Sequence, residues 1–118
     1  MQLNHIDLTV PDVAVVSSFF QAHFHFTLLE TRGNNGMAVL QGDGNFILVL
    51  TRNTTEHQSS YPDRFHIGFL LDSEQAVSTA YFNMIAAGVE VPSPPKKMHN
   101  RFTFYVRLLD SILIEIGH

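Results

Sequence analysis

Three widely separated side chains in this 118-residue sequence are of types that bind divalent metals. His5 and His66 each lie in a segment whose apolar and polar residues alternate, and Glu115 interrupts the apolar run 112–116. A carboxylate in such a run is costly to bury unless it is paired or binds a metal. Two imidazoles and one carboxylate can bind a first-row divalent metal on one face and leave other coordination positions open for a substrate.

Alternation also predicts the face that each of these side chains takes. In the last segment, the isoleucines at 112, 114 and 116 share one face, so Glu115 points to the other. The same reasoning places His5 opposite the apolar residues of its segment, and His66 likewise. The residues alone leave a second interpretation open, in which the three are unrelated, half-buried polar side chains.

The elements that would position these residues form two series. In the first half, Asp12 is predicted to cap a helix whose apolar stripe has helical spacing. The expected elements are a strand over 3–10, the helix over 13–24, strands over 26–32 and 37–41, a hairpin turn at 43–44 and a strand over 45–51.

The second half repeats this order. Asp72 or Ser73 is predicted to cap a helix that ends at Gly88. Its predicted apolar stripe consists of Val77, Tyr81, Met84 and Ile85. The expected strands cover 64–71, 89–91, 101–107 and 111–117, with a rigid proline-rich loop at 92–95.

The two halves also match in sequence. The segment 5–8 lies over 66–69, and 47–50 lies over 113–116. We therefore predict an α+β fold of two βαβββ modules that form a curved mixed sheet around a cavity, with the helices on the outer face. The whole chain, 1–118, would be a single domain, with one module at about 1–51, a polar connection at 52–63 and the other module at about 64–118.

Three segments of the chain resemble the motifs of a known superfamily. The opening 5–12 with Phe19 and Phe20, the segment 65–69 and the ending 104–115 are similar to motifs of the vicinal oxygen chelate superfamily. This superfamily includes glyoxalase I, extradiol dioxygenases, fosfomycin-resistance thiol transferases and bleomycin-binding proteins. The resemblance implies that the single domain is glyoxalase-like and that His5, His66 and Glu115 match the superfamily's metal positions, with Glu115 also catalytic.

The sequence departs from typical glyoxalase I at a fourth ligand position, which is Val49 by the repeat offset. The remaining three-ligand pattern is closer to the dioxygenases and fosfomycin transferases. Thr51 and Lys96 stand roughly where the dioxygenases carry additional active-site histidines. The cofactor implied is one divalent first-row metal ion (Mn, Fe, Zn or Ni), and the sequence does not decide among lyase, dioxygenase and thiol transferase.

Further residues on the same face are candidates for substrate contact. Members of the superfamily often place a tyrosine at the position of Tyr105, as a proton donor or substrate contact; a packing role is the alternative. Arg101 and Arg107 share its face and could hold a substrate carboxylate or phosphate, or be solvated charges. Thr9 lies on the face of His5 and is the remaining predicted substrate-binding residue.

Composition narrows the function classes. The net charge of −4 and the lack of any long basic run argue against nucleic-acid binding. No apolar stretch approaches a membrane span, no signal peptide is apparent, and a chain without cysteine is expected in the cytoplasm. The partners expected are a small-molecule substrate and a second copy of the chain in a homodimer, since two-module members of the superfamily commonly dimerise.

Two functions follow as hypotheses. The first is a metal-dependent enzyme acting on a small molecule that chelates the metal through adjacent oxygens. The alternative is a metal-free small-molecule binding protein of the bleomycin-resistance type.

Overall fold

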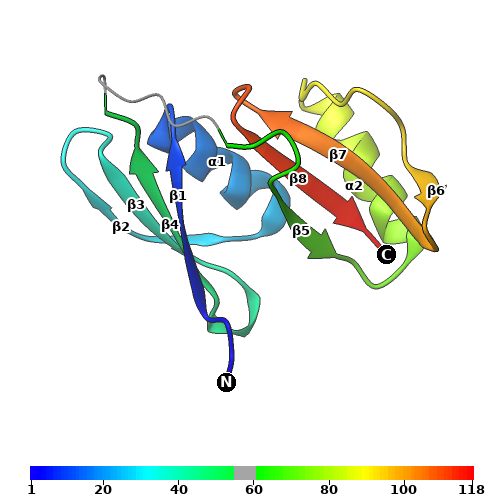
Figure 1. The fold of residues 1–118 in the computed structure, drawn as a ribbon, viewed down its shortest axis with the longest axis horizontal. Coiled ribbons are helices and arrows are strands. Elements are labelled where there is room, and N and C mark those ends of the chain that lie inside the picture. Colours follow the sequence, from blue (N-terminus) through cyan, green and yellow to red (C-terminus); the bar gives the residue numbers. More distant parts are fainter. Residues whose placement is uncertain (55–60) are drawn as a thin grey trace. The chain divides into compact units, whose positions relative to one another are not determined.

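The computed structural model describes residues 1–54 and 61–118, and the chain divides into two compact units after residue 60. Each unit contains one α-helix and four strands, and Figure 1 labels them along the chain. Half of the predicted connection, 52–63, lies outside the described residues, because 55–60 are not among them. Among the described residues, no helix has both the length and the apolar character that a membrane crossing requires.

The first unit is a four-stranded mixed sheet with one helix against it. Its elements are β1 (His5–Val10), α1 (Val13–Phe24), β2 (Thr27–Arg32), β3 (Met37–Gln41), the short 3-10 helix η1 (Asp43–Asn45) and β4 (Ile47–Arg52). The strand order is β1-β4-β3-β2, with β1 parallel to β4 and the other pairs antiparallel. Asp12 caps α1 by accepting a hydrogen bond from the Val15 amide at 3.1 Å. This unit's core consists mainly of Leu8, Leu40, Leu48 and Leu50 with Phe20.

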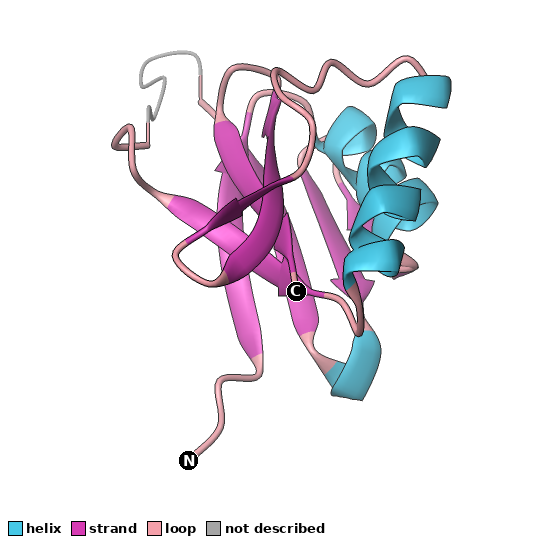
Figure 2. Cartoon of the chain, turned by 90° about the vertical axis from the view of Figure 1, so that its right-hand side faces the viewer, coloured by secondary structure: helices cyan, strands magenta, loops and turns pink. Residues whose placement is uncertain are grey.

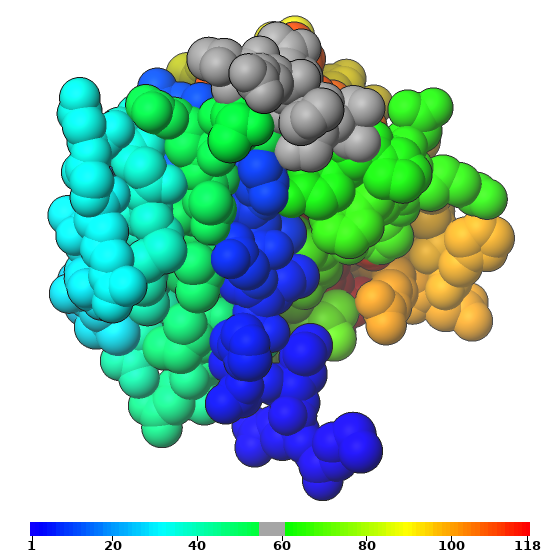
Figure 3. Space-filling model, turned by 60° about the vertical axis from the view of Figure 1, so that its left-hand side comes forward, coloured from blue at the N-terminus to red at the C-terminus, as the bar shows by residue number. Residues whose placement is uncertain are grey.

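The edge strand β2 is the most exposed part of this sheet. All six of its residues are exposed, and Figure 3 shows the strand and the turn after it as the cyan surface at one side. The buried leucines of this unit therefore lie on β1, β3 and β4.

The second unit repeats the topology of the first. Its elements are β5 (His66–Leu70), α2 (Glu74–Ala86), β6 (Lys96–Met98), β7 (Arg101–Leu108) and β8 (Ile112–Gly117), in the strand order β5-β8-β7-β6. Ser73 caps α2 through the Ala76 amide at 3.1 Å. The alternate residues of β7 and β8, among them Phe104 and Ile114, are buried on the side of α2, and the Tyr81 ring of the helix meets Phe104 edge-on at 5.7 Å. Figure 2 shows the two sets of strands and the helices by type of structure.

The α+β class and the two βαβββ modules are confirmed, with the sheet present as one four-stranded sheet in each module. One strand prediction is wrong: 89–91 is not a strand, and the module's second strand is Lys96–Met98. The prolines at 92, 94 and 95 lack the amide hydrogen that a ladder needs, so pairing with β7 begins only after them. Lys96 and Lys97, which follow the predicted loop, therefore belong to an edge strand.

The predicted stripe of α2 is partly wrong as well. Val77 and Met84 are buried, but Ile85 is 44% exposed. With 3.6 residues per turn, Met84 returns to within about 20° of Val77 around the helix, whereas Ile85 is about 80° away. The sheet contact therefore follows the i, i+7 pair, and Ile85 falls outside it.

The turn between β7 and β8 offers a stability test. The Ser111 amide bonds to the Leu108 carbonyl at 3.0 Å, and the two residues between them, Leu109 and Asp110, have φ of 50° and 51°. A two-residue hairpin turn with both φ values positive favours Asn-Gly, and a left-handed backbone costs an ordinary residue about 1–2 kcal/mol. We expect the double variant Leu109→Asn, Asp110→Gly to raise the free energy of unfolding by about 1–2 kcal/mol, measured as a higher urea midpoint at unchanged slope.

Leu109→Ala is the matched control, because it removes the exposed side chain but keeps a residue that disfavours positive φ. An equal rise in that control, or no rise in the double variant, would contradict the explanation by backbone strain.

Candidate functional site

The face of the second sheet opposite α2 gathers the predicted chemistry-bearing residues of that unit. Glu115 in β8 is in register with Gly68 of β5 on one side and with Tyr105 of β7 on the other. Residues in register on neighbouring strands point to the same face, and so do residues two apart on one strand. His66 and Thr103 therefore share this face with Glu115 and Tyr105.

Glu115 is the centre of this group. One carboxylate oxygen, Oε2, lies 3.2 Å from His66 Nε2, and the other, Oε1, lies 3.3 Å from the hydroxyl of Thr103. The Thr103 hydroxyl is also 2.8 Å from the Ile116 carbonyl, so its one hydrogen is shared between the two acceptors, with the shorter bond to Ile116. The Glu115 side chain is only 14% exposed, so a largely buried carboxylate is held between an imidazole and a hydroxyl.

The protonation of His66 is constrained by its other ring nitrogen. Nδ1 lies 2.9 Å from the carbonyl oxygen of Arg64, and a carbonyl can only accept, so Nδ1 must carry the hydrogen. In the neutral ring, Nε2 then presents a lone pair toward the Glu115 carboxylate. Two acceptors at this distance need a positive charge near them, which is either a proton on Nε2 or a metal cation bound by both.

His5 shows the same arrangement in the first unit. Its Nδ1 lies 2.7 Å from Asn4 Oδ1, so Nε2 is the ring nitrogen that could act as a ligand. In metal sites a histidine ligand typically donates its second ring N–H to an oxygen acceptor in this way, which fixes the ring. Two imidazole nitrogens and a carboxylate suit Mn, Fe, Ni or Zn, so the residues present fit the implied metal.

The geometry does not by itself assemble a complete metal cluster. Among residues 1–54 and 61–118, no group of three or more histidine or acidic side chains is close enough together to hold a metal ion. The structure brings His66 and Glu115 together within the second unit, and it places His5 on β1 of the first unit.

Tyr105 joins the group through its hydroxyl. Burial raises the pKa of Tyr105 above its ordinary value of 10.0, the negative charge of Glu115 and a hydrogen bond to that carboxylate raise it further, and Arg101 lowers it. The ring of Tyr105 also meets that of His66 nearly at right angles, with centroids 6.3 Å apart. The phenol is therefore a protonated donor at neutral pH, next to both predicted metal-binding residues of this unit.

The predicted substrate-binding residues are spread more widely. Arg101 begins β7, is exposed and is close enough to affect the pKa of Tyr105. Arg107 is exposed on the same face, in register with Leu113. Thr9 is half-buried in β1 and belongs to the first unit. Val49 is in register with Asp7, as Glu115 is with Gly68, so an apolar side chain stands where the repeat would place a carboxylate.

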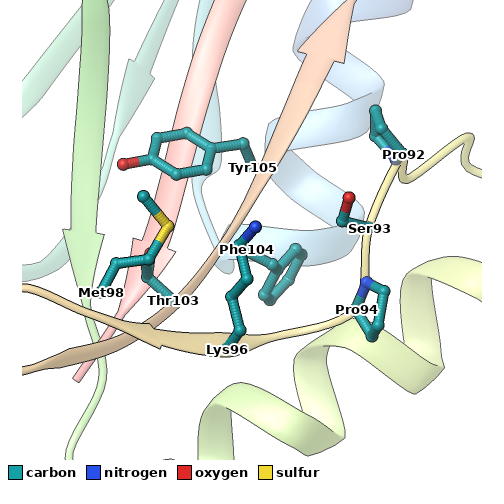
Figure 4. Close-up of a pocket in the computed structure, with 8 residues that line it drawn as sticks. All are labelled: Pro92, Ser93, Pro94, Lys96, Met98, Thr103, Phe104 and Tyr105. Carbon is teal, nitrogen blue, oxygen red and sulfur yellow. The ribbon is translucent and has the colours of Figure 1, made fainter.

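A pocket beside this group was not predicted. It has a volume of about 200 Å³ and lies where the proline-rich loop and β6 meet β7 (Figure 4). Its lining includes Thr103 and Tyr105 on β7 and Lys96 and Met98 on β6. The alternation of β7 assigns Thr103 to the face of Tyr105, but the proline-rich loop carried no signal that it would form a wall.

The sequence matches one family model, which is described as the Glyoxalase/Bleomycin resistance protein/Dioxygenase superfamily, over residues 2–116. No curated protein matches the chain.

Solved structures resemble the chain over nearly its whole length. A structure described as a possible glyoxalase from Bacillus cereus has a TM-score of 0.88 and 35% identity, covering 100% of this chain and 99% of its own. The fosfomycin resistance protein FosX from Listeria monocytogenes has a TM-score of 0.77 and 22% identity, covering 99% and 92%. A variant of that FosX, complexed with Mn(II) and 1S,2S-dihydroxypropylphosphonic acid, has a TM-score of 0.76 and 21% identity, covering 98% and 87%.

Proposed function

Because the chain belongs to the Glyoxalase/Bleomycin resistance protein/Dioxygenase superfamily, we propose that it is a divalent-metal-dependent enzyme. Its substrate would be a small molecule that chelates the metal through two adjacent oxygens, and its reaction that of a lyase, dioxygenase or thiol transferase. The observation that carries the proposal is the 3.2 Å approach of His66 Nε2 to the Glu115 carboxylate, with the hydrogen on Nδ1 bonded to the Arg64 carbonyl.

In this proposal His5, His66 and Glu115 hold the metal. A bound divalent ion would act as a Lewis acid toward the substrate oxygens. The Arg64 carbonyl fixes the ring of His66, and the Thr103 hydroxyl fixes one oxygen of Glu115. These two hydrogen bonds would keep the side chains of His66 and Glu115 oriented before the substrate binds.

Tyr105 would donate a proton to the substrate oxygen on which negative charge develops. Its raised pKa keeps the phenol protonated at neutral pH, as a general acid requires. Arg101, Arg107 and Thr9 would contact the rest of the substrate. The FosX variant solved with Mn(II) and a dihydroxypropylphosphonic acid supports Mn as one of the metals to test first.

The second candidate function is a metal-free small-molecule binding protein of the bleomycin-resistance type. The observation that favours it is the same contact, because a protonated His66 would form a direct ion pair with Glu115 and leave no position for a metal. In that case the face of the second sheet would serve only to bind ligands.

Metal content separates the two functions. We expect protein purified without chelator, and then incubated with Mn, Fe, Zn or Ni salts, to bind about one metal ion per chain. The metal should also raise the melting temperature, and EDTA should reverse this rise. At a free metal concentration of 100 times Kd, binding adds about 2.7 kcal/mol to the free energy of unfolding. His5→Ala should lose both effects.

His25→Asn is the control, since His25 is exposed and its φ of 57° suits asparagine. Unchanged melting with every metal, together with no bound metal, would rule out the enzyme proposal and favour the binding protein.

We also propose that the chain forms a homodimer with two-fold symmetry in the cytoplasm. Light scattering at micromolar concentration should give about twice the 13.3 kDa of one chain, and a single-chain mass would contradict this.

Mixing His5→Ala and Glu115→Gln chains tests whether each metal site takes its ligands from one chain or from both. If each site takes ligands from both chains, a mixed dimer contains one intact site and regains metal binding. If each site takes them from one chain, it does not.

A further inference from the structure

The two adjacent lysines of β6 have different surroundings. Lys97 is in register with Phe102, and its amino group lies 3.3 Å from Glu74 Oε1 at the start of α2. Lys96 is in register with Thr103, so its side chain leaves the strand on the opposite face, the one that carries Tyr105 and Glu115. Among the described residues, Lys96 forms no ion pair with a carboxylate.

Lys96 instead lines the pocket of about 200 Å³ beside Tyr105. Figure 4 shows its amino nitrogen in the midst of the lining side chains, with the Ser93 hydroxyl at the proline-rich loop and the Tyr105 ring at the other end. Pro92, Pro94 and Met98 provide apolar walls. Drug-sized ligands occupy pockets of about 300–1,000 Å³, so this pocket suits a ligand portion of only a few heavy atoms.

Lys96 is exposed, so an anion can reach its amino group from solvent. The apolar walls beside it exclude part of the surrounding water, which strengthens the attraction between the two charges. Serine and tyrosine hydroxyls can donate further hydrogen bonds to such an anion. Thr103 and Tyr105 line the pocket and also contact Glu115, so the pocket adjoins the candidate metal-binding face.

We propose that this pocket binds the anionic end of a small organic substrate, a carboxylate or a phosphonate, with Lys96 as its counter-ion. The inference rests on the proposed function for the position of the reacting oxygens, which would lie on the Glu115 side of Tyr105. It adds that the substrate is a short molecule with an anionic group a few bonds from its chelating oxygens.

The test uses the full-length protein without metal, in EDTA and a phosphate-free buffer, so that its result does not depend on the metal proposal. Butanoate and propylphosphonate are the anionic probes, and butanamide is the neutral probe of similar size. Binding is followed by amide chemical shifts in NMR titrations. We expect at least one anion to bind saturably and to shift the amides of β6 and of the loop before it, whereas butanamide binds at least about tenfold more weakly.

Lys96→Gln should weaken anion binding about tenfold or more, because it removes the charged donor. Lys97→Gln is the matched control: it removes the same charge one residue away, and its expected change is less than about twofold. Lys96→Arg should retain binding, because it keeps the charge. Both glutamine substitutions lie in β6, so a loss of binding caused by unfolding of this strand would appear in both variants.

Three results would overturn the inference: no saturable binding of either anion, equal binding of butanoate and butanamide, or equal losses in Lys96→Gln and Lys97→Gln. Failure of the metal proposal has a different signature. A protein that binds no metal but binds these anions through Lys96 would overturn the enzyme and keep the pocket, and a metal-binding protein without Lys96-dependent anion binding would do the reverse.

Discussion

Glu115→Gln should abolish metal-dependent turnover while leaving the second unit folded. The change replaces a carboxylate oxygen with an amide nitrogen of nearly the same shape, so the side chain still fits between His66 and Thr103. An amide nitrogen cannot ligate the metal as a carboxylate oxygen does, and the negative charge that draws a divalent cation is lost. We expect metal affinity to fall by at least about 10–100-fold, the range found when even supporting residues of a metal site are removed.

The metal-free variant should be well folded for a specific reason. Because the Arg64 carbonyl holds the hydrogen of His66 on Nδ1, the Nε2 lone pair can accept a hydrogen bond from the new amide group. The free energy of unfolding should then stay within about 1 kcal/mol of wild type in EDTA. Circular dichroism and urea unfolding measure this, and isothermal titration with Mn or Zn measures the affinity.

The ionisation of Tyr105 gives an independent readout. Part of the rise in its pKa comes from the charge of Glu115 and the hydrogen bond to it, so the variant should ionise this tyrosine at lower pH than wild type does. Glu90→Gln, at an exposed position, is the control and should leave metal binding and tyrosine ionisation unchanged. Wild-type turnover in Glu115→Gln would show that the ligand set is wrong, whatever the substrate proves to be.

Sequence patterns predicted the parts of this fold that depend on periodicity and capping. The helix over 13–24 and the strand over 37–41 have the predicted bounds, since helical and alternating patterns extend to their ends. The prediction of a strand at 89–91 was wrong, because a segment of only three residues shows too little periodicity to identify a strand. The observed strand, β6, is set by its pairing with β7. An edge strand of three residues is defined by its partner more than by its own sequence.

For the candidate site, too, sequence patterns predict some features and not others. Alternation assigns His66, Thr103, Tyr105 and Glu115 to one face, and the structure places them together there. The sequence could not indicate that Arg64 orients His66, because that contact is made by a backbone carbonyl, which every residue has. Nor could it distinguish Lys96 from Lys97, because which of the two reaches Glu74 depends on the register of β6 against β7.

Tyr105→Phe should separate proton donation from metal binding. The ring keeps its place on β7 and its edge contact with His66, and neither His66 nor Glu115 is changed, so the variant should bind metal as wild type does. If the phenol is the general acid, turnover should fall by about 10²–10⁴-fold. The free energy of unfolding should change little, since the deletion removes one hydroxyl at the edge of the group.

The pH profile distinguishes a proton donor from a mere contact. Burial first, and then the charge and hydrogen bond of Glu115, raise the pKa of Tyr105 above 10.0, and the acid form is the active one. Wild-type activity should therefore persist through neutral pH and decline only as the pH rises through that raised pKa; a cation bound to Glu115 would offset its charge and move this decline to lower pH. In Tyr105→Phe the residual activity should lack this decline.

Tyr81→Phe is the control, because Tyr81 lies on α2 and packs on Phe104. This variant should keep both the wild-type turnover rate and the wild-type pH profile. A Tyr105→Phe variant that retains the wild-type rate and the alkaline decline would assign the proton transfer to another group.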